Sequence, residues 1–164
     1  MITQERLHDL FEYREDGNLI RKVSTSNKVK VGSVAGWFQP PSYFRVVIDG
    51  TTYPVHRMIF LYHYGYLTPG MEIDHIDGNP GNNRIDNLRE ATRSQNMLNC
   101  KIRSNSKSGV KGVSWDKSNS KWKAEITIKK GKYGYLGRYN TLEEAEAVVR
   151  EAREKYHGEY ARHG

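Results

Sequence analysis

Residues 72–96 read EIDHIDGNPGNNRIDNLREATRSQN, and this stretch decides how the chain folds. Residues 72–76 predict a short strand. The turn-forming residues that follow are too polar to be buried, so they predict a surface loop. Thr92 and Gln95 have the spacing of a capping box, which predicts a helix over 93–100. The pattern is therefore strand, loop and helix.

A strand, loop and helix of this size can fold back and bring the side chains of Asp74, His75 and Asn96 together. The carboxylate and amide oxygens of Asp74 and Asn96 are hard donors, which suit Mg²⁺ or Mn²⁺ better than Zn²⁺. An imidazole has an unperturbed pKa of about 6.5, so His75 can deprotonate water near neutral pH. A metal beside a histidine base is an arrangement for phosphodiester hydrolysis. Taken alone, an Asp-His pair is more often two polar loop residues that make turns.

The whole stretch closely resembles the HNH motif of phage and intron-encoded homing endonucleases, which implies the ββα-metal fold over residues 71–100. By that resemblance, Asp74 binds the metal, His75 is the general base, Asn87 fixes that histidine, and Asn96 completes the metal site. The first and last positions are histidine in the name-giving members, and a known branch uses the Asp and Asn found here. The resemblance thus implies one divalent ion, Mg²⁺ or Mn²⁺, per active site.

Other residues around the motif admit two interpretations. Arg89 and Arg93 can contact DNA phosphate or be ordinary surface arginines. His56 lies in a Val-His-Arg segment that recurs upstream in such proteins, and a structural, hydrogen-bonded role is favoured for it. The single cysteine, Cys100, excludes a Cys-x-x-Cys zinc site.

The chain has 164 residues, which is room for one ordinary domain or two small ones. Before the motif, the pattern predicts a helix over 3–11, a β-hairpin of 43–48 and 51–55 around Asp49-Gly50, and a helix over 57–64. No apolar run is long enough to span a membrane, and the first residues lack a signal-peptide pattern. We therefore expect an intracellular protein, and the resemblance implies the cytoplasm of a phage-infected bacterium.

The positive charge is concentrated in the C-terminal part of the chain. Residues 1–100 carry 11 Lys or Arg and 11 Asp or Glu, whereas residues 101–164 carry 15 and 8, so the net charge of +7 lies in the second segment. Within 101–132 the ratio is 10 to 2. Such a basic stretch is typical of a polyanion binder, although a solvated lysine-rich surface would have the same composition.

Residues 101–107 are mostly polar and show no hydrophobic periodicity, which predicts a linker. Three strand candidates of an antiparallel meander follow, 110–115, 122–128 and 133–139. Thr141 and Glu144 then form a capping box at the start of an amphipathic helix that Gly158 ends. This pattern predicts a three-stranded sheet packed on one helix.

Residues 108–162 look like the DNA-binding domain of plant APETALA2 and ethylene-response factors, which is also found fused to phage HNH nucleases. The motifs that carry the resemblance are GVKGVSW at 109–115, KWKAEI at 121–126, YLGRY at 135–139 and TLEEA at 141–145. It implies that one face of the sheet packs on the helix while the other enters the major groove. The positions that match plant DNA contacts are Lys111, Ser114, Asp116, Glu125, Thr127, Tyr133 and Tyr135.

Several of the plant contacts are arginines, and Ser114, Asp116 and Thr127 cannot make their bidentate guanine contact, so the plant target sequence is not carried over. Lysines are better candidates for phosphate contacts, which fix register without reading bases. They are Lys117, Lys121, Lys123, Lys129, Lys130 and Lys132. Trp115 stays a candidate DNA contact, whereas Trp122 is predicted to pack under the helix.

These patterns predict an α+β protein in two parts. Residues 1–100 would form a metal-dependent nuclease in which His75 activates water, and residues 108–162 would hold double-stranded DNA. The resemblance to the HNH family implies that cleavage leaves a 5′-phosphate. The alternative is a non-catalytic DNA-binding regulator on the same scaffold. One active site per chain makes nicking the simpler expectation, although a dimer would cut both strands. No membrane and no obligatory protein partner are predicted.

Overall fold

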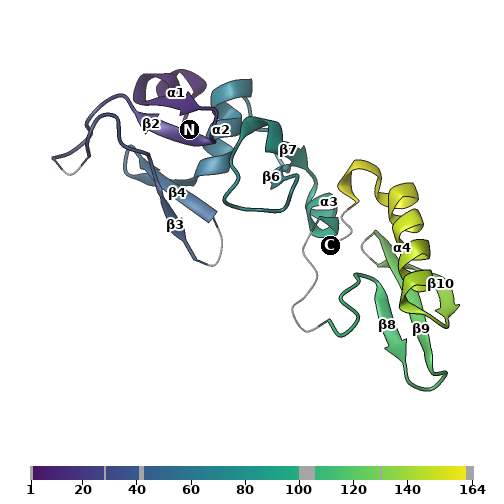
Figure 1. The fold of residues 1–164 in the computed structure, drawn as a ribbon. Helices are drawn as coiled ribbons and strands as arrows, with labels where there is room; N and C mark the ends of the chain where they lie inside the picture. Colours follow the sequence, from purple (N-terminus) through teal and green to yellow (C-terminus); the bar gives the residue numbers. More distant parts are fainter. Residues whose placement is uncertain (1, 28, 41–42, 100–105, 130, 162–164) are drawn as a thin grey trace. The chain divides into compact units, whose positions relative to one another are not determined.

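The computed structural model describes residues 2–27, 29–40, 43–99, 106–129 and 131–161. It confirms the expected α+β class (Figure 1). The chain divides into two compact units, Met1–Ala91 and Thr92–Gly164. No helix among the described residues is long and apolar enough to cross a membrane. The expected domain boundaries at 100 and 108 stay a prediction.

The described residues of the first unit form two helices, one short 3₁₀ turn and three small antiparallel sheets. Its elements are α1 (Gln4–Leu10), β1 (Phe11–Arg14), β2 (Asn18–Arg21), β3 (Trp37–Gln39), β4 (Tyr43–Ile48), β5 (Thr51–Pro54), α2 (Val55–Tyr64), β6 (Glu72–His75), η1 (Ile85–Asn87) and β7 (Leu88–Ala91). The sheets pair β1 with β2, β3 with β4 with β5, and β6 with β7. Each pairing is antiparallel.

The β4–β5 hairpin forms where the sequence predicts it. Asp49 and Gly50 both have positive φ, 47° and 78°, as a two-residue hairpin turn of the favoured twist requires. The Asp49 carboxylate also accepts hydrogen bonds from Arg6 of α1, at 3.0 and 2.8 Å. The hairpin is thereby tied to the first helix.

Helix α2 lies at the centre of the core of the first unit. Its apolar side chains pack with those of α1, β1, β2 and β4, and the fully buried members include Leu7, Leu19, Val46, Met58 and Ile59. The helix begins at Val55, two residues before the predicted start, because Pro54 sets an extended backbone at its entrance. It ends at Gly65, which has the left-handed φ of 77°. Ile73 and Leu88 of the β6–β7 hairpin belong to this core, so the strands that carry the motif pack on the same apolar cluster as α2.

The second unit contains α3 (Arg93–Leu98), β8 (Val113–Asp116), β9 (Lys121–Lys129), β10 (Lys132–Tyr139), α4 (Leu142–His157) and η2 (Gly158–Tyr160). Both predicted capping boxes are present, Thr92 with Gln95 at α3 and Thr141 with Glu144 at α4. Helix α3 is shorter than predicted and ends at Leu98.

The three strands form one antiparallel sheet in the order β10-β9-β8, and α4 packs along one face of it (Figure 1). Strand β8 begins three residues later than predicted, because Gly112 has a positive φ of 81° and a Cβ there would meet the carbonyl oxygen of Glu125. The core between sheet and helix is small and consists of Val110, Val113, Ala124, Ala145 and Val149. Trp122 packs against it, as the sequence predicts.

Candidate functional site

The β6–β7 hairpin positions the two residues that begin the motif. Asp74 and His75 are the last two residues of β6, and they pair with Arg89 and Leu88 of β7. Asp74 is 6% exposed and His75 is 4% exposed. A buried carboxylate and a buried imidazole both need polar partners, since an unpaired polar group in this environment is costly.

Arg89 is the partner of Asp74 directly across the hairpin. Its Nε and Nη2 donate to Asp74 Oδ2 at 3.2 and 3.1 Å. The exposed fractions of the two side chains are 14% for Arg89 and 6% for Asp74, so the pair is largely shielded from water. This contact gives Arg89 a place inside the site, beside the residue for which metal binding is predicted.

Asn83 is the partner of His75. The imidazole Nε2 lies 3.0 Å from Asn83 Oδ1, and Asn83 is itself only 5% exposed. Because an amide oxygen only accepts hydrogen bonds, Nε2 must be the protonated nitrogen in this contact. In the neutral imidazole the lone pair therefore lies on Nδ1.

Asn87 braces the loop between the strands. Its Nδ2 donates to Asp77 Oδ1 at 3.0 Å and to the Asn82 carbonyl at 2.8 Å, and its Oδ1 accepts from Asp77 N at 3.0 Å. Burial alone would raise the pKa of Asp77, but hydrogen bonds from Asn82, Asn79 and Asn87 outweigh it and hold the pKa below its ordinary value. The carboxylate thus stays charged and keeps the loop closed. The role predicted for Asn87 toward the histidine stays a prediction.

Tyr43 and His56 form an aromatic cluster with His75. The Tyr43 ring is stacked on His75 at 6.0 Å between centroids, and the His56 ring lies 5.0 Å from His75 and 4.7 Å from Tyr43. His56 is buried, and no hydrogen-bond partner of its Nδ1 exists among the described residues. Burial, together with the charges of His75, Arg57 and Arg45, lowers the pKa of His56 to about 3. His56 is therefore a neutral packing partner of the imidazole at physiological pH.

Arg93 and Asn96 lie on α3, which belongs to the second unit. Arg93 is exposed and Asn96 is half-buried. The convergence of Asn96 with Asp74 stays a prediction. Within the described ranges, no three His, Cys, Asp or Glu side chains cluster as a metal site.

The sheet of the second unit has one face toward α4 and one face away from it. On β9, Ala124 and Ile126 point toward the helix and are buried. Lys121, Lys123, Glu125 and Thr127 alternate with them and therefore share the opposite face. We call this the outer face; by strand register it also holds Ser114, Asp116, Tyr133, Tyr135 and Arg138.

The predicted DNA contacts differ in their surroundings. Lys117, Lys121 and Lys132 are exposed. Lys123 Nζ forms an ion pair with Glu125 at 2.7 Å, and Lys111 Nζ donates to the Leu98 carbonyl at 2.6 Å. The predicted contact Lys130 lies outside the described residues, and the side chain of Lys129 is likewise not described.

Aromatic rings are also exposed on this unit. Tyr133 is 73% exposed, Tyr135 is 56% exposed, and Trp115 is 45% exposed with its ring edge against Trp122. Large apolar rings that remain accessible beside lysines suit contacts with the sugars and bases of nucleic acid.

Two family models match the chain. The HNH endonuclease model matches residues 53–98, and the AP2 domain model matches residues 108–159. "Protein 3.8" of Escherichia phage T7 is 38% identical over 98 residues, which are 60% of this chain and 79% of that protein. The chain belongs to the HNH endonuclease family. An AP2 domain follows the HNH domain in the sequence, and the two domains together imply a DNA substrate.

A second relative extends over more of the chain. "Uncharacterized HNH endonuclease L560" of Acanthamoeba polyphaga mimivirus is 32% identical over 126 residues, which are 76% of this chain and 64% of that protein. No solved structure matches the chain significantly.

Sequence reasoning missed two polar residues that the structure places in contact with the predicted site residues. In the HNH domain, Asn83 contacts the His75 imidazole. Nothing in the sequence distinguishes Asn83 from its neighbour Asn82 or from the other loop asparagines. In the AP2 domain, Arg138 forms an ion pair with Asp116 at 2.7 Å. Neither contact can be inferred from spacing along the chain.

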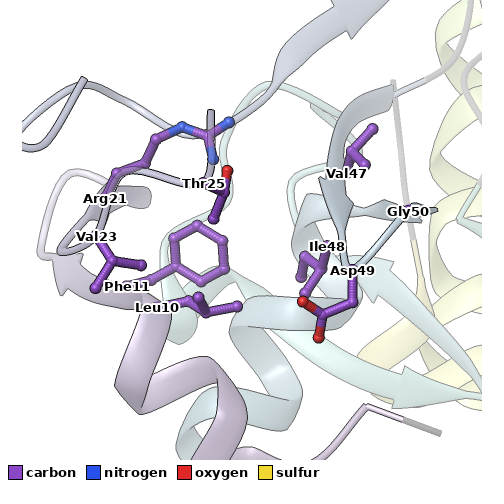
Figure 2. A pocket seen from close by; sticks show the side chains of 9 residues that line it. All are labelled: Leu10, Phe11, Arg21, Val23, Thr25, Val47, Ile48, Asp49 and Gly50. Carbon is purple, nitrogen blue, oxygen red and sulfur yellow. The ribbon is translucent and has the colours of Figure 1, made fainter. Parts of the chain in front are cut away.

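A separate pocket of about 300 Å³ lies in the first unit, between the α1–β1 junction, the segment after β2 and the β4–β5 turn (Figure 2). Leu10, Phe11 and Ile48 form its apolar wall, and its polar groups include Arg21 and Thr25 (Figure 2). Its lining contains none of the predicted catalytic residues.

Proposed function

We propose that this chain is a metal-dependent endonuclease that hydrolyses phosphodiester bonds of double-stranded DNA. The HNH domain, residues 1–100, would cut the DNA, and the AP2 domain, residues 108–162, would hold it after the linker 101–107. The observation that carries the proposal is the buried contact between His75 Nε2 and Asn83 Oδ1, beside the Asp74–Arg89 pair.

His75 acts as the general base through Nδ1. Its Nε2 proton is engaged by Asn83, so the opposite ring nitrogen carries the lone pair that accepts a proton from water. Packing of the imidazole against Tyr43 and His56 restricts its rotation. A general base that is held in one tautomer and one orientation is aligned for proton transfer more of the time than a mobile base, so the reaction is faster.

Asp74 and Asn96 would hold the divalent ion. Both supply oxygen donors, which suits Mg²⁺ or Mn²⁺ with water and phosphate oxygens in the remaining positions. Arg89 fits this assignment because it donates both hydrogen bonds to one carboxylate oxygen of Asp74 and so fixes the orientation of that group. When bound, the ion neutralises charge on the scissile phosphate and the leaving oxygen.

The AP2 domain supplies affinity for the DNA backbone. Exposed lysines on or beside the outer face, Lys117, Lys121 and Lys132, would neutralise phosphates, and Arg93 is proposed as a further phosphate contact. Because one chain contains one HNH motif, the expected product of a single binding event is a nick. Membership of the HNH family favours a 5′-phosphate at that nick.

The test is incubation of supercoiled plasmid with the full-length protein in Mg²⁺ or Mn²⁺, and in EDTA. We expect nicked circles that depend on the metal, and loss of cleavage in His75→Ala with DNA binding retained. Arg84→Ala, which removes an exposed ion pair with Asp86, is the matched control and should cleave normally. Absence of metal-dependent nicking on plasmid and on phage DNA would overturn the proposal in favour of a non-catalytic DNA-binding regulator.

A further inference from the structure

A β-bulge in β10 places Tyr135 and Arg138 on the same face of the AP2 sheet. Tyr135 pairs with Glu125, Gly137 pairs with Ala124, and Arg138 pairs with Lys123, with a register shift between Tyr135 and Gly137. Residues three apart on a regular strand point to opposite faces, so the inserted residue redirects Arg138 to the outer face.

Gly137 makes this bulge possible. Its φ of 131° is rarely adopted by other residues, and a Cβ at this position would lie 2.8 Å from the Tyr139 hydroxyl. The orientation of Arg138 is therefore built into the backbone of β10.

Two neighbours hold the Arg138 guanidinium. Nε donates to Asp116 Oδ2 at 2.7 Å, and Nη1 donates to the Tyr135 hydroxyl at 3.1 Å. The guanidinium carbon lies 5.5 Å from the centroid of the Tyr135 ring. Nη2 has no hydrogen-bond partner within the part of the chain that the structure describes, and the side chain is 40% exposed.

Asp116 stays ionised in this arrangement. Hydrogen bonds from Arg138 and from Asn119 lower the pKa of Asp116 to about 2. A carboxylate among lysines weakens attraction to DNA phosphate, so its presence on the outer face is unfavourable for non-specific binding. Fixing the orientation of an arginine that reads bases is a role that offsets this cost.

We propose that Arg138 is a base-reading residue of this protein, and that it contacts the O6 and N7 atoms of a guanine in the major groove of double-stranded DNA. Asp116 and Tyr135 are its positioning residues. The proposal rests on the DNA-holding role proposed above for the AP2 domain, and it names the residue that supplies specificity there.

Two features favour a guanine over a phosphate as the target of Arg138. Anchoring through Nε and one hydrogen of Nη1 leaves the outer edge of the guanidinium, with donors on both terminal nitrogens, for the paired acceptors of guanine. The plane is fixed at two points, which a diffuse phosphate contact does not require.

The experiment uses the full-length protein in EDTA, so that binding is measured without cleavage. Preferred sites are selected from double-stranded DNA with a randomised central segment, and affinities are then measured by fluorescence anisotropy. Each G·C pair of the preferred site is replaced by A·T in turn. We expect one replacement to weaken the wild-type protein by roughly 5- to 150-fold, the range of one bidentate contact.

Arg138→Lys and Arg138→Ala should lose the preference at that pair and keep the preferences elsewhere. Asp116→Asn should also reduce the preference at that pair. The affinity of this variant for unrelated DNA should rise, because a negative charge is removed. The matched control is Arg150→Lys, which alters an arginine–glutamate pair on α4 and should leave every preference unchanged.

Two results would overturn the proposal. A uniform loss of affinity on all sequences in Arg138→Ala would make Arg138 a phosphate contact. Absence of any base preference in the wild-type protein would show that Arg138 does not discriminate between bases. Neither result bears on the proposed nuclease activity, because the plasmid assay tests that activity independently.

Discussion

The Nε2 atom of His75 lies 3.0 Å from the Oδ1 atom of Asn83, and both side chains are almost completely buried. The contact joins the end of β6 to the loop that precedes η1. It determines which imidazole nitrogen carries the proton, and so which one can act as a base. The catalytic proposal for His75 therefore depends on a loop residue.

Asn83→Ala should slow cleavage at least about tenfold, because a general base contributes roughly 10²–10⁴-fold and its tautomer is no longer fixed. The same change removes a buried hydrogen bond of the His75 imidazole, which lowers the free energy of unfolding by about 0.5–1.5 kcal/mol. Single-turnover cleavage and urea unfolding measure the two effects.

Asn83→Asp separates positioning from packing. The carboxylate still accepts from Nε2, so cleavage should persist, and the pH of half-maximal rate should move upward because the negative charge favours the protonated imidazole. Asn82→Ala, which removes an exposed contact with Asp77, is the control. An unchanged pH profile in Asn83→Asp would show that Asn83 does not act through His75.

Arg89→Ala should destabilise the HNH domain strongly. The Asp74 carboxylate would stay buried and lose its hydrogen bonds from Arg89, and removing one member of such a buried ion pair costs about 3–5 kcal/mol. Arg84→Ala breaks an exposed pair of the same type and should change the urea midpoint little. Equal midpoints for the two variants would contradict the structural role of Arg89.

The stability of the HNH domain should fall with acidification because His56 is buried in its neutral form. Its pKa is about 3 in the folded chain against an ordinary 6.5, so below pH 6.5 the unfolded state binds the additional proton. Stability should drop between pH 6.5 and 3, by at most about 1.4 kcal/mol per pH unit from this group. The neighbouring charges of His75, Arg57 and Arg45 act in the same direction.

His56→Gln tests this prediction, because glutamine is polar and does not titrate. We expect the variant to have a flatter dependence of the free energy of unfolding on pH in that window, whatever its stability at pH 7. Urea unfolding at several pH values measures it. Parallel curves for the two proteins would mean that His56 titrates normally in the folded state.

Much of the fold follows from local sequence rules. The Asp49-Gly50 hairpin and the two capping boxes at Thr92 and Thr141 involve residues close in sequence, and each forms as predicted. Strand β3 (Trp37–Gln39) was not predicted, because its three side chains are all exposed and show no alternation. Periodicity reports burial, and an exposed strand gives no such signal.

The missed polar contacts have a different cause. The loop contains several asparagines with the same turn-forming chemistry, and only the folded loop distinguishes the one that faces His75. Arg138 was overlooked because its face depends on a bulge, and a bulge is a property of the pairing between two strands. Contacts that depend on register are not encoded in the spacing of one strand.

The salt dependence of DNA binding should report which lysines contact phosphate. Each phosphate contact that is lost should reduce the slope of log affinity against log salt concentration by about 1. We expect this change for Lys117→Gln and for Lys121→Gln, which lie exposed at the β8–β9 turn, with the loss of affinity equal on all sequences. Lys155→Gln on α4 is the matched control, because α4 packs on the face of the sheet opposite to the outer face. If Lys155→Gln changes the slope as much as Lys117→Gln does, the DNA is held by a different surface of the AP2 domain.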